Sequence, residues 1–340
     1  MKYEKKVAVI GLGSMGKRRI RNLKALGFEK IYGFDLREDR KLSSKQQYGI
    51  QVISSIEDLI SEKFDALIIS TPPDTHHIYM KIAIDYRIPA FIEASVLDTD
   101  FNDIIRLSEK YKVLLAPSCT LLFHPGIILI SQIIKSSQLG QITNVLYHSG
   151  QYLPDWHSFE DVSEFYVSNK ETGGAREIIP FELTWLTKIF GFPKKVAGFY
   201  IKTLNIKGAE KIDDTYNFIY NYETYLLNIS VDVVSRHATR RLLINGALGQ
   251  IYWDWDENMI KKYDSKTNSW TELLYDTIPA QSGYNKNITE QMYIDELNQF
   301  FITAFNDGIF PNNLIDDQRV LNLLYAAERS AHEDKFIVIK

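Results

Sequence analysis

The chain has 340 residues, 45% of them apolar, and its 39 basic side chains are nearly balanced by 43 acidic ones, for a net charge of −4. At roughly 150 residues per domain, this length predicts two domains. The balance argues against a dedicated nucleic-acid-binding protein, which needs a basic surface to displace phosphate counterions. The single cysteine, Cys119, excludes an intramolecular disulfide and a cysteine zinc cluster and fits a reducing cytoplasm. The apolar runs are shorter than a membrane span, so no membrane partner is expected.

The first third of the chain alternates short apolar runs with amphipathic stretches. This alternation predicts βαβ units and a parallel sheet that is buried on both faces. The expected strands are Val7–Ile10, Ile31–Asp35, one beginning at Val52, Ala66–Ser70, Ala90–Glu93 and Val113–Ala116. The expected helices are Lys17–Leu26, Ile56–Ser61, Ile78–Tyr86 and Asn102–Tyr111.

The pattern changes near Phe123–His124–Pro125, and strand-like alternation rich in Tyr and Ile dominates from Ile142 to Tyr275. Successive strands of this kind predict a mostly antiparallel sheet with a helix on one face. The expected strands are Thr143–His148, Val196–Leu204, Tyr216–Tyr222, Tyr225–Val233, Arg241–Asn245, Gln250–Trp255 and a last one at Phe336–Ile339. The expected helices are Gly126–Lys135, Ala175–Phe190, Thr289–Asn306 and Asp316–Ala331.

We therefore predict an α/β protein with two domains. Residues 1–122 form an N-terminal Rossmann domain with a doubly wound parallel sheet. Residues 123–340 form a C-terminal α/β domain with a large, mostly antiparallel open sheet, which binds substrate and mediates oligomerisation. An alternative for the tail, residues 311–340, is that it packs back on the first domain.

The segment Gly11–Gly16 has the spacing G-x-G-x-x-G between a predicted strand and a predicted helix. Gly11 allows the tight turn, Gly13 lets the backbone approach a pyrophosphate, and Gly16 allows the helix to pack closely on the strand. Ser14 and Met15 complete the turn, and the N–H groups that begin the helix can bind phosphate oxygens. This pattern predicts an adenine dinucleotide as cofactor.

An acidic residue at the end of the second strand indicates which dinucleotide is bound. Asp35 lies 19 residues after Gly16, where a carboxylate accepts hydrogen bonds from the ribose hydroxyls and repels a 2′-phosphate. NAD is therefore favoured. Arg37 and Arg40 weaken this preference because a guanidinium can hold the 2′-phosphate, so NADP stays open.

Ligands of open α/β sheets lie beyond the carboxyl ends of the strands, so the loops after the fourth and fifth strands are expected to border the cofactor. The cofactor residues expected there are Ser70, Thr71, Pro72, His76, Glu93 and Ala94. A structural role for His76, capping or packing the next helix, is the favoured alternative.

Together these features resemble the Gfo/Idh/MocA oxidoreductases, the family of glucose–fructose oxidoreductase and inositol dehydrogenase. The resemblance rests on Gly11–Gly16, Asp35, Thr71–Pro72 with His76, Glu93, Phe123–His124–Pro125, Gly173–Gly174 and Arg319–Val320–Leu321. It implies a Rossmann domain followed by an α/β domain, and hydride transfer between NAD(P) and a hydroxyl or carbonyl carbon of a sugar or cyclitol. It also implies a homodimer or homotetramer assembled through the large sheet.

The chain departs from the family at both groups that usually handle the proton. The family usually has Glu-Lys-Pro after the fifth strand, whereas this chain has Glu93-Ala94-Ser95. Aligned on Gly173–Gly174, the usual histidine of the second-domain helix is replaced by Glu182, or by Phe181 if the register shifts by one.

Two carboxylates and an arginine on this helix are the candidates to replace them. Glu177 and Glu182 are five residues apart, about 140° around a helix, so they cannot both face the cofactor. Glu182 is favoured by position, whereas Glu177 is favoured if Pro180 distorts the helix. Arg176 could hold a carboxylate or phosphate of the substrate. The sequence offers no metal-ligand spacing.

The segment Gly150–His157 resembles a branch of the family from surface-polysaccharide sugar pathways. Its Tyr152, Asp155 and Trp156 are expected to contact substrate, since Trp156 could stack on a sugar ring. His157 can titrate near neutral pH and is a further candidate acid or base.

These features predict a cytoplasmic NAD(P)-dependent oxidoreductase acting on a sugar, nucleotide sugar or related polyol. A non-catalytic NAD-binding sensor or partner subunit of the same fold is the alternative, because both usual proton-handling groups are absent. A β-hydroxyacid dehydrogenase also fits the glycine turn, but its second domain would be helical and not strand-rich.

Overall fold

The computed structural model describes residues 4–156, 161–278 and 288–339. The chain divides into two compact units. The first comprises residues 1–120 and 293–319, and the second comprises residues 121–292 and 320–340. The tail, residues 311–340, is therefore split between the units: residues 311–319 belong to the first unit, and residues from Val320 onwards belong to the second.

The first unit contains a six-stranded sheet in the order β3-β2-β1-β4-β5-β6. Its strands are β1 (Val7–Ile10), β2 (Ile31–Phe34), β3 (Gln51–Val52), β4 (Ala66–Ile69), β5 (Ala90–Ile92) and β6 (Leu115–Pro117). All neighbouring strands run parallel, and the order reverses between β1 and β4. In a doubly wound sheet, this reversal is where a dinucleotide binds.

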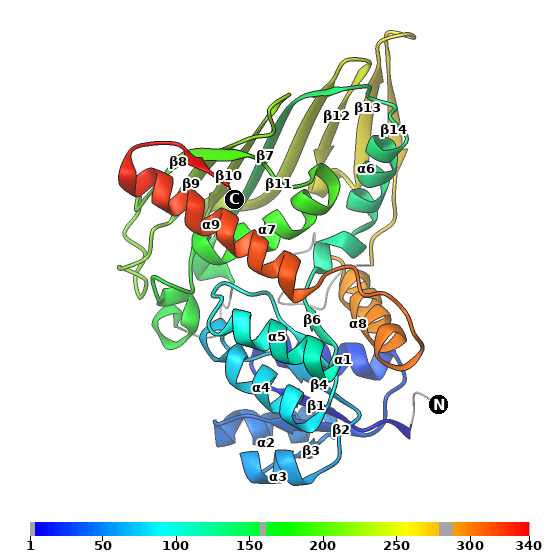
Figure 1. The fold of residues 1–340 in the computed structure, drawn as a ribbon, viewed down its shortest axis with the longest axis vertical. Helices are drawn as coiled ribbons and strands as arrows, with labels where there is room; N and C mark the ends of the chain where they lie inside the picture. The colour runs from blue at the N-terminus through cyan, green and yellow to red at the C-terminus, as the bar shows by residue number, and fades with distance from the viewer. Residues whose placement is uncertain (1–3, 157–160, 279–287, 340) are drawn as a thin grey trace. The chain divides into compact units, whose positions relative to one another are not determined.

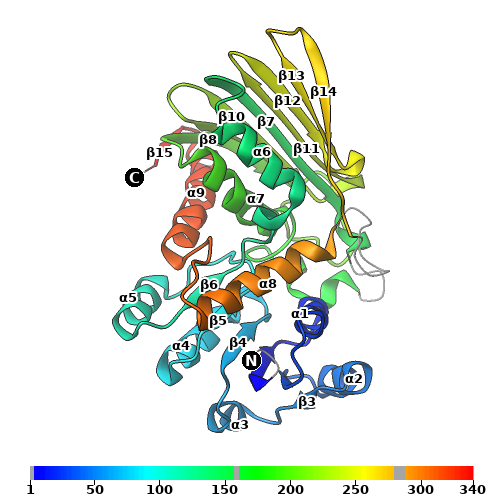
Figure 2. The ribbon, with the colours of Figure 1, turned by 90° about the vertical axis from the view of Figure 1, so that its right-hand side faces the viewer.

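Helices cover both faces of this parallel sheet. They are α1 (Ser14–Ala25), α2 (Glu38–Tyr48), α3 (Ile56–Ser61), α4 (His76–Tyr86) and α5 (Phe101–Tyr111). Figure 2 shows α1 and α2 on one face and α4 and α5 on the other. Burial on both faces explains why β1 and β4 consist only of buried apolar residues.

The second unit contains a nine-stranded sheet in the order β14-β13-β12-β11-β7-β10-β9-β8-β15. Its strands are β7 (Ile142–Tyr152), β8 (Lys195–Ile201), β9 (Thr215–Asn221), β10 (Leu226–Asp232), β11 (Val234–Gly246), β12 (Gly249–Asp254), β13 (Met259–Asp264), β14 (Ser269–Leu274) and β15 (Ile337–Val338). Neighbours are antiparallel except β10 and β7, which run parallel.

One face of the nine-stranded sheet is covered by α6 (Pro125–Lys135) and α7 (Ala175–Phe190), as Figures 1 and 2 show. The remaining helices of the chain are α8 (Glu290–Phe305) and α9 (Leu314–Glu333). Side chains of β9 alternate between buried and exposed, with Tyr216, Phe218 and Tyr220 buried and Ile219 exposed. The strands therefore turn one row of side chains towards the helices and the other row outwards.

The predicted fold class is confirmed, and the expected elements occur with ends displaced by a few residues. Three elements were not predicted: α2, β13 and β14. Of these, α2 buries only Lys41 and Ser44, so it carries no apolar stripe that would reveal a helix. No helix of the described residues is long and apolar enough to cross a membrane.

The packing of α6 gives a matched test of the core of the second unit. Ile130 is fully buried, whereas Ile128 on the same helix is 40% exposed. We expect Ile130→Ala to lower the free energy of unfolding by about 2–5 kcal/mol because it leaves a cavity. Ile128→Ala should lower it by less than about 1 kcal/mol. Urea unfolding followed by circular dichroism measures both, and equal losses would contradict the described packing.

Candidate functional site

The glycine turn between β1 and α1 has no room for side chains. A Cβ at Gly16 would lie 1.8 Å from the carbonyl oxygen of Gly11, and one at Gly11 would lie 2.5 Å from that of Ser70. Gly11 also has a φ of +88°, which side-chain-bearing residues rarely adopt. The residue before α1 is Gly13, which has no side chain to cap the helix, and the first turn contains no acidic residue. The helix therefore presents its positive end to a ligand at this edge.

Asp35, directly after β2, is held by the backbone of two neighbouring loops. Its Oδ2 accepts a hydrogen bond from Leu12 N at 2.7 Å, and its Oδ1 accepts one from Arg37 N at 2.9 Å. Arg40 Nη1 lies 3.9 Å from the same carboxylate and 3.4 Å from a Cβ built on Gly13. The Arg37 side chain pairs with Asp39 at the surface. Of the two arginines, Arg40 is thus the one beside both the turn and the acid.

The loops after β4 and β5 carry buried polar atoms. His76 Nε2 donates to the Thr71 carbonyl oxygen at 2.9 Å, and burial lowers the pKa of this histidine, so the ring is neutral and positions the loop. The hydroxyls of Thr71 and Ser95 are buried and have no hydrogen-bond partner within the described residues. Because such groups are costly when unpaired, they point to a polar ligand at this edge. The glycine turn, Asp35 and these hydroxyls together fit a dinucleotide.

Glu93, at the end of β5, forms an ion pair that the sequence did not predict. Arg19 Nε donates to Glu93 Oε1 at 2.6 Å, and Ser70 Oγ donates to the same oxygen at 3.3 Å. Arg19 lies on the buried face of α1, three residues after Gly16. The position of Arg19 on the helix was the only sign of this ion pair in the sequence, because Glu93 is 74 residues further along the chain.

In the second unit, Glu182 is enclosed under the nine-stranded sheet. Its side chain is fully buried and accepts hydrogen bonds from four donors. These are Tyr147 Oη at 2.6 Å, Ser149 Oγ at 3.0 Å, Trp185 Nε1 at 2.9 Å and Arg240 Nε at 2.8 Å. A carboxylate with these partners and no exposed surface is placed for stability and not for proton exchange with a substrate. The geometry therefore does not support the expected preference for Glu182 as the acid or base.

Arg176 is also engaged within its own unit. Its Nε and Nη2 donate to the carboxylate of Glu328 on α9 at 2.5 and 3.2 Å, and its Nη1 donates to the carbonyl oxygen of Glu171. This bidentate ion pair occupies the guanidinium N–H groups of Arg176 that were expected to hold a carboxylate or phosphate of the substrate. Arg176 is better described as a structural link between α7 and α9.

Glu177 differs from both of these neighbours. It lies in the first turn of α7, after the tight Gly173–Gly174 turn, where a Cβ at Gly173 would lie 2.0 Å from the Val167 carbonyl oxygen. Tyr166 Oη donates to Glu177 Oε1, whereas Oε2 is buried without a described hydrogen-bond partner. Burial raises the pKa of Glu177 to about 7, although the Tyr166 hydrogen bond opposes the shift. Pro180 lies inside α7 without interrupting the helix. The environment of Glu177 in the first turn therefore does not require a break at Pro180.

The structure describes the proline loop after β7 as far as Trp156. The Arg236 guanidinium lies 3.8 Å from the centroid of the Tyr152 ring, and Asp155 is exposed. Trp156 is half-buried, and its Nε1 is buried without a described hydrogen-bond partner. His157 lies outside the described residues.

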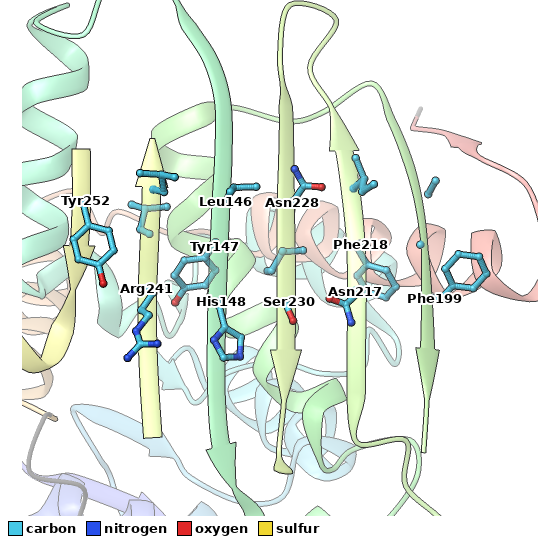
Figure 3. Close-up of a pocket in the computed structure, with 16 residues that line it drawn as sticks. Leu146, Tyr147, His148, Phe199, Asn217, Phe218, Asn228, Ser230, Arg241 and Tyr252 are labelled. Carbon is cyan, nitrogen blue, oxygen red and sulfur yellow. The ribbon is translucent and has the colours of Figure 1, made fainter. Parts of the chain in front are cut away.

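A hollow of about 540 Å³ lies on the open face of the nine-stranded sheet (Figure 3). Its rim combines apolar side chains such as Leu146 and Phe199 with the polar His148, Ser230 and Arg241. None of the site residues expected from the sequence lines it.

The comparisons with known proteins agree with this geometry. Residues 5–116 match the family model described as the oxidoreductase family with an NAD-binding Rossmann fold, Gfo/Idh/MocA. Residues 5–116 are thus similar to the NAD-binding domain of the Gfo/Idh/MocA oxidoreductases. The resemblance expected from the sequence is thereby confirmed, as is NAD as the cofactor. Comparison with curated proteins gave no significant match.

Solved structures with the same fold cover almost the whole chain. An oxidoreductase from Agrobacterium radiobacter, in complex with NAD⁺, L-tartaric acid and magnesium, is 16% identical, with a TM-score of 0.85 over 99% of this chain and 98% of that one. Levoglucosan dehydrogenase in complex with NADH is 14% identical, with a TM-score of 0.83 over 99% of both chains. GenD2 from gentamicin A biosynthesis, in complex with NAD, is 15% identical, with a TM-score of 0.80 over 100% of this chain and 98% of that one.

The contacts of Asp35 give a prediction for cofactor choice. Asp35→Asn should weaken NADH binding roughly tenfold, because a neutral amide loses charge-assisted hydrogen bonds to the ribose. The discrimination against NADPH should fall as well, because the repulsion of the 2′-phosphate is lost. Fluorescence titration with both dinucleotides measures this, with the exposed Asp85→Asn as the control. Unchanged NADH affinity in the Asp35 variant would remove this residue from the site.

The burial of Glu182 gives a second prediction. Glu182→Gln breaks a buried ion pair with Arg240, so we expect the free energy of unfolding to fall by about 3–5 kcal/mol. The exposed Glu171→Gln on the preceding loop is the control and should change stability little. A Glu182 variant that keeps full stability but loses turnover would instead identify Glu182 as the acid or base.

Proposed function

We propose that the chain transfers a hydride between NAD(H) and a hydroxyl- or carbonyl-bearing carbon of a sugar, nucleotide sugar or related polyol. In this proposal, the carboxyl group of Glu177 moves the proton. The observation that carries it is the carboxyl group of Glu177. It has a raised pKa and one buried oxygen without a hydrogen-bond partner among the described residues, and it lies on the helix where the family resemblance places the acid or base. The glycine turn, Asp35, Thr71 and Ser95 would hold the dinucleotide, which supplies or accepts the hydride when bound.

The pKa of Glu177 suits both directions of such a reaction. An acid–base group is most effective when its pKa lies near the working pH, and that of Glu177 is about 7. The protonated carboxyl can donate to a carbonyl oxygen during reduction, and the carboxylate can accept the hydroxyl proton during oxidation. Glu182 and Arg176 support this assignment because both are occupied by other side chains.

A sugar-like substrate is supported by the loop after β7 and by two proteins of similar fold. Trp156 and Tyr152 offer aromatic surface, and Asp155 offers an exposed carboxylate for hydroxyl groups. Levoglucosan dehydrogenase and a gentamicin biosynthetic protein, both similar in fold, have carbohydrate-related names. We propose a nucleotide sugar of surface-polysaccharide synthesis as the first substrate class to test.

We further propose a homodimer or homotetramer in the cytoplasm. The open face of the nine-stranded sheet exposes large apolar side chains, with Phe199 72% and Ile201 59% exposed. Such a patch is typical of a protein–protein interface. The only cysteine, Cys119, is buried and cannot form an intramolecular disulfide, which is compatible with a reducing compartment.

The second candidate function is a non-catalytic NAD-binding sensor or partner subunit. It is favoured by Ala94, which has no proton to move, and by the sequestration of Glu182. It predicts dinucleotide binding without turnover. The variants below separate it from an enzyme.

Glu177→Gln should lower kcat about 10²- to 10⁴-fold, the usual contribution of general acid–base catalysis, with NADH affinity unchanged. Turnover is followed by the absorbance of the reduced nicotinamide, against a panel of nucleotide sugars, free sugars and cyclitols. Glu171→Gln, an exposed neighbour, is the control and should retain the parent rate. A Glu177 variant as active as the parent would contradict the proposed role.

The pH dependence gives an independent test of Glu177. Reduction requires the protonated carboxyl, so its rate should fall as pH rises through the pKa of about 7, and oxidation should show the opposite dependence. The Tyr166 hydrogen bond lowers the pKa of Glu177, so Tyr166→Phe should move both profiles to higher pH. A shift to lower pH, or none, would mean that another group titrates.

A further inference from the structure

A buried cluster of three charged side chains in the first unit has no place in the mechanism above. Arg19 is fully buried and lies between two carboxylates. Its Nε and Nη2 donate to Glu93 at 2.6 and 3.0 Å, and Nη2 also donates to Glu296 on α8 at 2.9 Å. Its guanidinium lies 4.5 Å from the ring centroid of Phe91.

The residues that follow β6 supply three hydrogen-bond donors to Glu296. Its Oε1 accepts hydrogen bonds from Cys119 N at 2.6 Å and Ser118 Oγ at 2.9 Å, and its Oε2 accepts one from Thr120 Oγ1 at 2.7 Å. Burial and the charge of Glu93 raise the pKa of Glu296, whereas Arg19 and these hydrogen bonds oppose the rise. Four donors, Arg19 among them, thus surround this fully buried side chain.

With Glu93 and Glu296 both ionised, the cluster carries one more negative charge than positive. Among the described residues, Arg19 is the only cation that forms an ion pair with Glu93 or Glu296. The side chains of Arg19 and Glu296 are 0% exposed and that of Glu93 is 13% exposed. Water screens buried charges poorly, so the excess charge acts over several ångströms. Of the three side chains in the cluster, that of Glu93 is the one that is partly exposed.

This exposed end lies where the second half of a dinucleotide belongs. Glu93 follows β5, beyond the point where the strand order reverses, and Asp35 follows β2 on the opposite side of it. With the ribose of adenine at Asp35, the nicotinamide half falls to the carboxyl ends of β4 and β5. The next residue, Ala94, is uncharged, and burial lowers the pKa of His76, which is therefore neutral.

We propose that the Arg19–Glu93–Glu296 cluster makes this site prefer the oxidised, positively charged nicotinamide over the reduced, neutral one. The preference follows from charge alone, since the rest of the dinucleotide is the same in both forms. It rests on the NAD-binding assignment, and its consequence for direction rests on the proposed function. In the balanced reaction NADH + C=O + H⁺ ⇌ NAD⁺ + CH–OH, a site that stabilises NAD⁺ shifts the bound equilibrium towards the alcohol. The cluster thus favours carbonyl reduction.

The test is the ratio of two dissociation constants, Kd for NADH divided by Kd for NAD⁺, measured by fluorescence titration and by competition. Ala94→Lys adds a positive charge beside Glu93 without removing a buried partner. We expect it to lower the ratio roughly three- to tenfold by weakening NAD⁺ binding. Glu93→Gln should lower the ratio in the same direction. Glu296→Gln, if it folds, should do so less, because it lies deeper.

Asp35→Asn is the control because it acts on the ribose shared by both forms and should change both constants by the same factor. If Ala94→Lys and Glu93→Gln both keep the Kd ratio of the parent protein, the proposal is overturned. These binding constants need no substrate, so they remain decisive even if no sugar is turned over. Absence of binding by both dinucleotides would instead refute the cofactor assignment itself.

Discussion

The closeness of three backbone segments at the glycine turn is the constraint on which the cofactor site depends. The end of β1, the start of α1 and the end of β4 approach so tightly that a Cβ at Gly11 or Gly16 would overlap a carbonyl oxygen. This contact brings the positive end of α1 to the carboxyl edge of the sheet, at the reversal of the strand order. It also sets Leu12 N against Asp35, so the acid that is predicted to select the dinucleotide is positioned by the same turn.

Burial and partners then give chemically identical carboxylates different roles. Glu182 is fully buried with four donors, and Glu93 is paired with a guanidinium. Glu177 is buried with a single tyrosine donor, which is too little to offset desolvation, so its pKa rises to about 7. The number of donors, and not the position on the helix, distinguishes a structural carboxylate from one that can exchange a proton.

The sequence was informative wherever the signal was local. The apolar runs of β1 and β4 and the G-x-G-x-x-G spacing are each contained within a few residues, and these local features were predicted. The charge pairs were not predictable, because Arg19 and Glu296 are 277 residues apart and Arg176 and Glu328 are 152 apart. Position along α7 favoured Glu182 because nothing in the sequence shows that Arg240 on β11 lies against it.

The replacement of the family's usual lysine and histidine changes the charge of the proton-transfer chemistry as well as its residues. Protonated lysine and histidine are cations, whereas a protonated Glu177 is neutral and becomes an anion after donating. In the proposed function, Glu177 becomes a carboxylate on α7 when it donates its proton, whereas a protonated lysine or histidine would become neutral. Ala94 likewise adds no positive charge after Glu93. In this proposal, both departures from the family pattern remove a positive charge from the groups that handle the proton, so they are consistent with one another in electrostatic terms.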